Sequence, residues 1–300
     1  MDLNRQAIAL LEENRYEEAL DLFQEAVRRS RDVQSLTNLA WIYCHEEDVF
    51  EKALELAEEA VALKPASHFP YYLRGELYNR LGRWTEAESA WKQALTIHES
   101  KVAWHNLASA SYELGKTAEA SDHFKRAAGK SDAALYSHAK CLVDLGERDS
   151  AKQVLATFTE VDDDFVGEVE VADLYVDIEC FEEAVRWFAK GWEAYWKQPN
   201  WVGRYVFALR KLGQLQQAED VLNEARRLKL EEWQESAEEE CDEDWTERDK
   251  EEILERLQDD MKLYEQISAG YVPALEFETH YETACYLFGC SRHGHPEYQE

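Results

Sequence analysis

The residues whose chemistry is easiest to name lie near the C-terminus. Cys285, Cys290, His293 and His295 follow one another in the pattern C-x4-C-x2-H-x-H, and His280 precedes them. Thiolate sulfur and imidazole nitrogen are zinc ligands. This spacing differs from the usual structural zinc patterns, and no second CxxC pair accompanies it. The alternative is a buried cysteine on a helix followed by a polar tail. We therefore predict no metal and no other cofactor.

Signals for catalysis are otherwise missing. The sequence contains no GxSxG, P-loop, GxGxxG or HExxH motif. Its 63 aspartates and glutamates could supply an acid and base pair, but with so many carboxylates such pairs arise by chance. A metal-dependent enzyme centred on Cys290 and His293 is the one enzymatic alternative. We expect that the chain is not an enzyme.

The composition restricts the class of partner and the compartment. A net charge of −30 argues against nucleic-acid and anionic-membrane partners, and it either favours a basic partner or serves solubility alone. The first residues resemble neither a signal peptide nor an anchor, and no run approaches the roughly 20 apolar residues that span a bilayer. The six cysteines are scattered, which is typical of reduced thiols. We expect a cytoplasmic protein whose oligomeric state is left open.

The elements that must position any functional residue are helices. Residues 104–127 have the pattern of two short amphipathic helices joined by a tight turn at Gly115, a residue that can take the left-handed conformation. Small and apolar residues fall on one face of each helix: Trp104, Leu107, Ala108 and Ser111 in the first, and Ala120, Phe124 and Ala127 in the second. Such a hairpin cannot bury both faces alone and needs similar neighbours.

The same pattern recurs along the chain. Each copy carries an alanine at one place in its second helix: Ala19, Ala53, Ala87, Ala120, Ala151, Ala184 and Ala218. Successive alanines are 34, 34, 33, 31, 33 and 34 residues apart. Four copies have a glycine at the turn, and Glu179 takes that place in another. A period near 34 indicates helix pairs that stack and bury one another's faces.

A helix-turn-helix unit with this period resembles the tetratricopeptide-repeat family over residues 1–228. The resemblance implies an all-α fold, a right-handed superhelical solenoid of antiparallel helix pairs with C-terminal capping helices. We expect a solenoid of about seven repeats over residues 1–230, an acidic linker or helix extension over 231–250, and capping helices with a tail over 251–300.

The composition changes after residue 230. Residues 231–260 contain 16 acidic and 3 basic side chains. Thr246 and Asp249 predict the start of a helix through a capping box, and a last helix is predicted over 273–288. Asp162, Asp163 and Asp164 predict another helix N-terminus. The last seventy residues could cap the solenoid, fold back into its groove as a blocker, or pair with another chain.

In the family that this chain resembles, the first helix of each repeat lines a concave groove. The resemblance places these residues in the groove: Trp41, Tyr72, Asn79, Arg80, His105, Tyr112, Tyr136, Lys140, Asp173, Phe207 and Arg210. Aromatic and charged side chains together are typical of a protein interface. The alternative is that several of the tyrosines only pack between helices. Of the clamp used by chaperone-tail adaptors only the asparagines match, at Asn4, Asn38 and Asn106, which argues against that role.

The sequence therefore predicts a protein-protein interaction module or scaffold that binds a partner protein or peptide in the groove. One alternative is a bacterial immunity-type inhibitor that neutralises a basic toxin, based on the charge of residues 231–260. Another is a regulatory protein that controls a signalling or transcription factor through a peptide in the groove.

Overall fold

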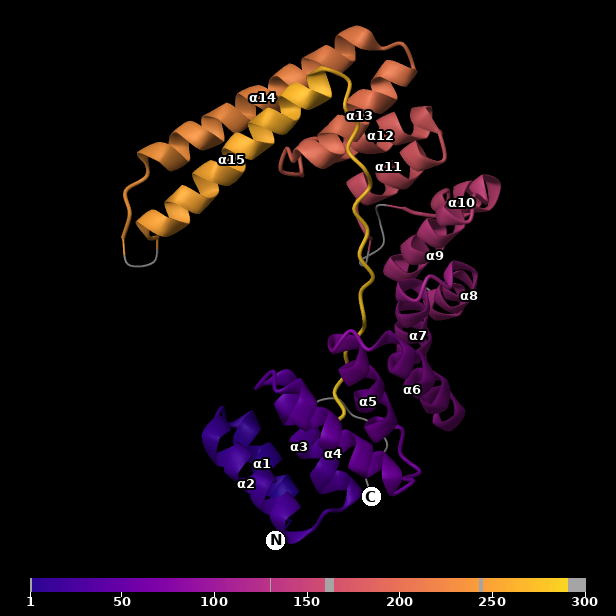
Figure 1. Cartoon of the computed structure of the whole chain (residues 1–300), viewed down its shortest axis with the longest axis vertical. Coiled ribbons are helices and arrows are strands. Elements are labelled where there is room, and N and C mark those ends of the chain that lie inside the picture. Colours follow the sequence, from indigo (N-terminus) through magenta and orange to yellow (C-terminus); the bar gives the residue numbers. More distant parts are fainter. Residues whose placement is uncertain (1, 130, 160–164, 243–244, 291–300) are drawn as a thin grey trace. The chain divides into compact units, whose positions relative to one another are not determined.

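A computed structural model describes residues 2–129, 131–159, 165–242 and 245–290. Within these ranges the chain forms fifteen α-helices and no β-strand, which confirms the predicted all-α class (Figure 1). None of the described helices is long and apolar enough to cross a membrane. The predicted helix start at Asp162, Asp163 and Asp164 lies outside the described residues. The chain divides into two compact units: unit 1 contains residues 1–141 and 279–300, and unit 2 contains residues 142–278.

Unit 1 is built from helix pairs. The pairs are α1 (Leu3–Glu12) with α2 (Tyr16–Arg29), α3 (Val33–His45) with α4 (Phe50–Ala62), α5 (Phe69–Arg80) with α6 (Trp84–Ile97), and α7 (Lys101–Glu113) with α8 (Thr117–Ala128). Helix α9 (Asp132–Asp144) begins the next pair, and the boundary of the unit falls within it. The first helices α1, α3, α5 and α7 also contact one another in order. We call their shared surface the inner face.

Each pair turns at a residue with a left-handed backbone. The angle φ lies between 53° and 75° at seven such positions: Asn14, Asp48, Gly82, Gly115, Gly146, Glu179 and Gly213. Each of them precedes one of the recurring alanines by five residues, and all seven alanines are buried. The prediction that Glu179 takes the place of the turn glycine is confirmed. Asn14 and Asp48 are residue types that tolerate this conformation, whereas Glu179 adopts it at a steric cost.

Helices α5 and α6 approach each other closely at Gly75. A Cβ atom at this position would lie 2.6 Å from Cε2 of Trp91, whose side chain is fully buried. The indole Nε1 of Trp91 donates to Oδ1 of Asn79 at 3.3 Å. The absence of a side chain at Gly75 therefore lets a large aromatic ring fill the space between the helices, which fixes the position of α5.

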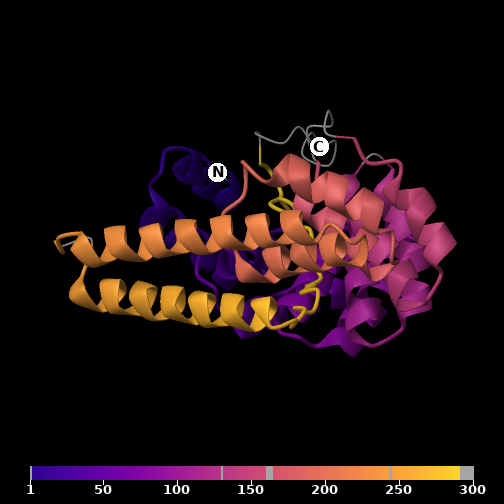
Figure 2. The same ribbon diagram turned by 90° about the horizontal axis from the view of Figure 1, so that it is seen from above.

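Unit 2 contains α10 (Arg148–Leu155), α11 (Glu168–Asp177), α12 (Phe181–Gly191), α13 (Pro199–Lys211), α14 (Leu215–Glu238) and α15 (Glu247–Ser268). Helix α14 runs past residue 230 to Glu238, so the first acidic residues extend a helix. Helix α15 begins with the predicted capping box of Thr246 and Asp249. It lies beside α14 as the second arm of a long hairpin (Figure 2).

No helix follows α15 among the described residues. Residues 271–287 have neither helical nor strand structure, and a turn occupies 288–289 (Figure 1). The prediction of a helix over 273–288 is wrong. The stretch contains three tyrosines, one phenylalanine and two threonines, residue types that favour extended backbone over helix. Side chains of other elements bind several polar groups of its backbone instead.

Candidate functional site

An extended segment of the chain lies on the inner face of unit 1. We call residues 279–290 the C-terminal segment. Two buried asparagines bind its backbone, each through both atoms of the side-chain amide. Asn106 of α7 accepts from the N–H of Glu282 at 2.7 Å and donates to the carbonyl of the same residue at 2.8 Å. Asn38 of α3 does the same for Phe288, at 2.7 and 3.1 Å. These hydrogen bonds involve only backbone groups, so they do not depend on which side chain the bound residue carries.

The two asparagines set a regular spacing. Each begins an Asn-Leu-Ala triplet, at residues 38–40 and 106–108, so they occupy equivalent places two repeats apart. The residues that they bind, Phe288 and Glu282, are six apart and in the opposite order. The C-terminal segment therefore runs antiparallel to the order of the repeats and advances three residues per repeat.

Further polar contacts hold the segment between and beyond the asparagines. His105 Nε2 donates to the carbonyl of His280 at 3.1 Å, and the hydroxyl of Ser109 donates to the same oxygen. Trp41 Nε1 donates to the carbonyl of Ala284 at 3.4 Å. Burial lowers the pKa of His105, against the opposing effect of the Glu282 carboxylate 3.6 Å from Nδ1. His105 therefore acts as a neutral imidazole with its proton on Nε2.

Apolar side chains of the segment complete the core of unit 1. Tyr286 and Leu287 are almost fully buried, and Cys290 is buried as well. The ring of Tyr286 lies 5.9 Å from the ring centres of both Phe69 and Tyr72. A pocket of about 420 Å³ lies at the end nearest the N-terminus, lined in part by Ile8, Leu11, Trp41, Cys285 and Leu287. These apolar contacts depend on which side chains the segment carries, whereas the contacts of the two asparagines involve only its backbone.

Four of the residues predicted to line a groove contact the C-terminal segment. Trp41 and His105 donate to its carbonyls, and Tyr72 packs against Tyr286. The guanidinium of Arg80 lies 5.4 Å from the ring centre of Tyr281, a cation–π contact.

Other predicted residues bond within unit 1. The buried Asn79 accepts from Trp91, and Lys140 Nζ donates to the hydroxyl of Tyr112 at 3.3 Å. Tyr136 is half-buried on α9. The bonds of Asn79 and Lys140 each join two helices.

The remaining predicted residues belong to unit 2. Phe207 packs edge-on against Phe181 at 5.7 Å. Arg210 donates to the carbonyls of Ile267 and Ser268, at 2.9 and 3.4 Å, and so binds the C-terminal end of α15. Asp173 accepts from Arg204 Nε at 2.7 Å, and burial raises the pKa of this carboxyl to about 7 against the effect of the guanidinium.

Arg204 binds the backbone of the chain within unit 2. Its Nη1 donates to the carbonyl of Pro273 at 3.3 Å. Arg204 lies nine residues before its turn glycine, Gly213, as Asn106 does before Gly115.

The sequence interpretation noted Asn38 and Asn106 only as matches to the clamp of chaperone-tail adaptors, a role it argued against, and it did not select Arg204. The signal was present for the asparagines, because the triplet Asn-Leu-Ala occurs at both positions. Arg204 carries no such signal, since its role depends on the course of residues 271–278.

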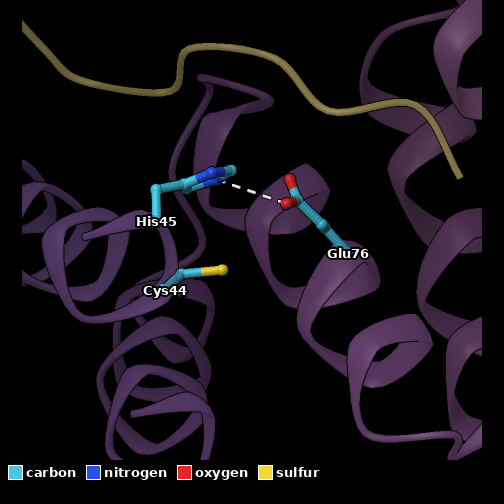
Figure 3. A group of neighbouring side chains, drawn as sticks. All are labelled: Cys44, His45 and Glu76. Atoms are coloured by element: carbon cyan, nitrogen blue, oxygen red, sulfur yellow. Dashed lines mark ion pairs between the residues drawn. The ribbon is translucent and has the colours of Figure 1, made fainter. Parts of the chain in front are cut away.

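A group of possible metal ligands lies at the inner face, formed by Cys44, His45 and Glu76 (Figure 3). Their ligand atoms all lie within 4.8 Å of one another, and sulfur, imidazole and carboxylate are zinc donors. Arg80 Nε already lies 3.0 Å from Glu76 Oε1, and burial raises the pKa of the Cys44 thiol to about 12. The Arg80 guanidinium on the Glu76 carboxylate and the protonated thiol of Cys44 both disfavour metal binding. We therefore assign these three residues to the polar part of the inner face.

The cysteine and histidine pattern at the C-terminus is described only in part. Cys290 is buried and Cys285 is half-buried, whereas His293 and His295 lie outside the described residues.

A family model described as tetratricopeptide repeat matches residues 4–68, 48–101 and 72–135. Residues 4–135 match the tetratricopeptide-repeat family. These residues include the repeats that carry Asn38 and Asn106. The helix pairs of unit 1 and the left-handed turns are therefore those of the family, and the C-terminal segment lies against the first helices of its repeats.

Among curated proteins, this chain is similar to the protein O-mannosyl-transferase TMTC3 of Homo sapiens, with 28% identity over 162 residues. The match covers 51% of this chain and 18% of that protein, so the chain spans less than a fifth of its relative. The transferase activity in that name belongs to the larger protein.

Two solved structures show the same fold. A tetratricopeptide repeat protein from Parabacteroides merdae has 18% identity and a TM-score of 0.53, with 78% of this chain and 98% of that chain covered. The C-terminal part of a repeat protein from Cytophaga hutchinsonii has 13% identity and a TM-score of 0.55, with 75% and 92% covered.

Proposed function

We propose that this chain is a protein-binding module whose inner face in unit 1 binds an extended segment of a partner protein. The observation that carries the proposal is the pair of bidentate contacts that Asn38 and Asn106 make with the backbone of the C-terminal segment. A tetratricopeptide-repeat scaffold is an appropriate support for such a site.

The chemistry of the face suits a peptide in extended conformation. The asparagines are buried and their amides are fixed, so little side-chain entropy is lost when a peptide binds. Asn38 Nδ2 also donates to Asn4 Oδ1 at 3.3 Å, which orients its amide. A partner segment supplies the same N–H and carbonyl groups as residues 282 and 288, and it must displace the C-terminal segment to do so. The chain therefore acts by recognition and not by catalysis.

The test is a titration with a labelled peptide of residues 279–290 under reducing conditions. The receptor is a full-length chain carrying Tyr286→Asp and Leu287→Asp, which we call the released chain. Burying two carboxylates is costly, so its own segment leaves the face. We expect fluorescence anisotropy to show saturable binding. Adding Asn106→Ala should weaken it about tenfold, because two hydrogen bonds of about 0.5–1.5 kcal/mol each are lost.

The matched control is Asn223→Ala. Asn223 is an exposed asparagine on α14 whose side chain donates to Glu219. Binding unchanged by Asn106→Ala, or no binding by a released chain that circular dichroism shows to be folded, would contradict the proposal.

The same titration separates this function from the inhibitor alternative. Binding of a basic toxin through residues 231–260 is driven by charge and weakens strongly with salt. Binding through backbone hydrogen bonds at the inner face does not. We also propose a cytoplasmic location, which the six free cysteines support.

A further inference from the structure

The phenol of Tyr286 is a polar group buried on the inner face. The side chain is 2% exposed, and its hydroxyl has no hydrogen-bond partner among the described residues. Two other buried tyrosines are bonded: the hydroxyl of Tyr72 donates to the carbonyl of His98 at 2.8 Å, and that of Tyr264 to the carbonyl of Lys197 at 2.8 Å. Tyr286 is thus a poorly matched occupant of its site.

The groups around this hydroxyl do not compensate for it. Glu76 is fully buried, and Arg80 binds its Oε1 while Oε2 has no partner among the described residues. The Glu76 carboxylate adds to the effect of burial and raises the pKa of Tyr286, so the phenol is neutral. The ring, in contrast, packs in a tilted arrangement against Phe69 and in an edge-to-face arrangement with Tyr72. The site therefore matches an aromatic ring and not its hydroxyl.

We infer that the inner face selects a partner segment that places a phenylalanine where this chain places Tyr286, and that such a segment displaces the C-terminal segment. The inference rests on the proposed peptide-binding function. The spacing fixes the rest of the partner: it runs antiparallel to the repeats, and the phenylalanine lies two residues before the residue bound by Asn38. A partner with this residue replaces the chain's own segment because it buries the same ring without the hydroxyl.

The experiment compares three peptides of residues 279–290 on the released chain: the natural sequence, Tyr286→Phe, and Thr283→Val. Thr283 is exposed, so the third peptide loses a hydroxyl where none is buried. An unpaired buried hydroxyl costs about 1–3 kcal/mol, so the phenylalanine peptide should bind at least about fivefold tighter. The Thr283→Val peptide should match the natural one. If the released chain proves unfolded, the unmodified chain serves as receptor, because competition from its own segment weakens all three peptides equally.

A reciprocal measurement uses Tyr286→Phe in the otherwise unmodified full-length chain. Its own segment should bind more firmly, so the amides of Glu282 and Phe288 should gain at least about fivefold protection from hydrogen exchange. Equal or weaker binding of the phenylalanine peptide would overturn the inference while leaving the proposed function in place. Failure of all three peptides to bind a folded receptor would instead remove the proposed function.

Discussion

At the scale of single residues, the site depends on the side-chain amide of asparagine. One asparagine offers a donor and an acceptor in the geometry that a peptide group needs, and Asn38 and Asn106 use both. An aspartate keeps only the acceptor, and a leucine keeps neither. The chemistry of recognition therefore lies in two buried side chains, and the surrounding aromatic residues refine it.

Asn106→Leu tests this at constant side-chain size. Loss of two hydrogen bonds, about 1–3 kcal/mol together, should lower the exchange protection of the Glu282 amide about tenfold or more. Hydrogen exchange followed by mass spectrometry or NMR measures it. Asn223→Leu, on the exposed face of α14, should leave the same amide unchanged. Unaltered protection in the Asn106 variant would show that other contacts hold the segment.

His105 should make attachment of the segment depend on pH. Its pKa is lowered by burial in the folded chain, so between that value and about 6.5 the detached state binds more protons. Stability of the attached segment should therefore fall as the pH falls through this window. In His105→Gln, whose amide can still donate to the His280 carbonyl, this dependence should shrink. Exchange protection of residues 280–288 at pH 7.5 and 5 gives the comparison. His280 and Glu282 lie beside His105 in both proteins. An equal slope in the two would show that His105 is not the group responsible.

At the scale of elements, the period of the sequence predicted most of the helices. Alanines and turn residues at a fixed distance locate the helix pairs because close helix packing requires small side chains there. The tail is different. Phe277, Tyr281 and Ala284 have helical spacing, yet the segment is extended, because buried side chains far away in the sequence bind its backbone. No local pattern contains that information. The paired asparagines were visible in the sequence, but what they bind was not.

Gly115→Ala tests the turns. At this residue φ is 71° and no atom lies within 4 Å of an added Cβ, so only backbone strain is introduced. We expect a loss of about 1 kcal/mol in the free energy of unfolding. Gly115→Asn should lose less, since asparagine tolerates this conformation. Urea denaturation compares the two, and equal stability of alanine and glycine variants would exclude strain at the turn.

Gly75→Ala tests the approach of α5 and α6. The new methyl group would lie within 3 Å of the buried Trp91 ring, which has no free space to move into. Overpacking of this kind costs about 1–3 kcal/mol. A double variant, Gly75→Ala with Trp91→Phe, should recover part of the loss. Additive losses in thermal or urea unfolding would show that the two residues do not clash.

At the scale of the whole molecule, charge is the dominant property. A net charge of −30 on 300 residues means that like charges repel throughout the fold. Exposed ion pairs such as Arg227 with Glu231 offset little of this repulsion. The charge acts on the stability of the chain, whereas the inner face binds through neutral amides.

Salt should therefore affect stability and binding differently. Raising the salt concentration from about 20 to 300 mM shortens the screening length, so the melting temperature should rise. Binding of the 279–290 peptide to the released chain should change less than about threefold, because its contacts are hydrogen bonds and apolar burial. Four exposed acids near the end of α14 can be neutralised together as a control: Glu235→Gln, Glu238→Gln, Glu239→Gln and Glu240→Gln. That variant should melt higher at low salt and respond less to added salt. A peptide affinity that collapses with salt would point to charge as the basis of recognition.

The spacing of three residues per repeat has a consequence for the history of the chain. Asn38 and Asn106 are two repeats apart and bind residues six apart, so the length of the tail is matched to the number of repeats. Gain of one repeat between them would leave one amide facing the wrong residue unless the tail also gained three residues between 282 and 288. Among the descendants of this gene, the gain of one helix pair between Asn38 and Asn106 should therefore be accompanied by the gain of three residues between 282 and 288.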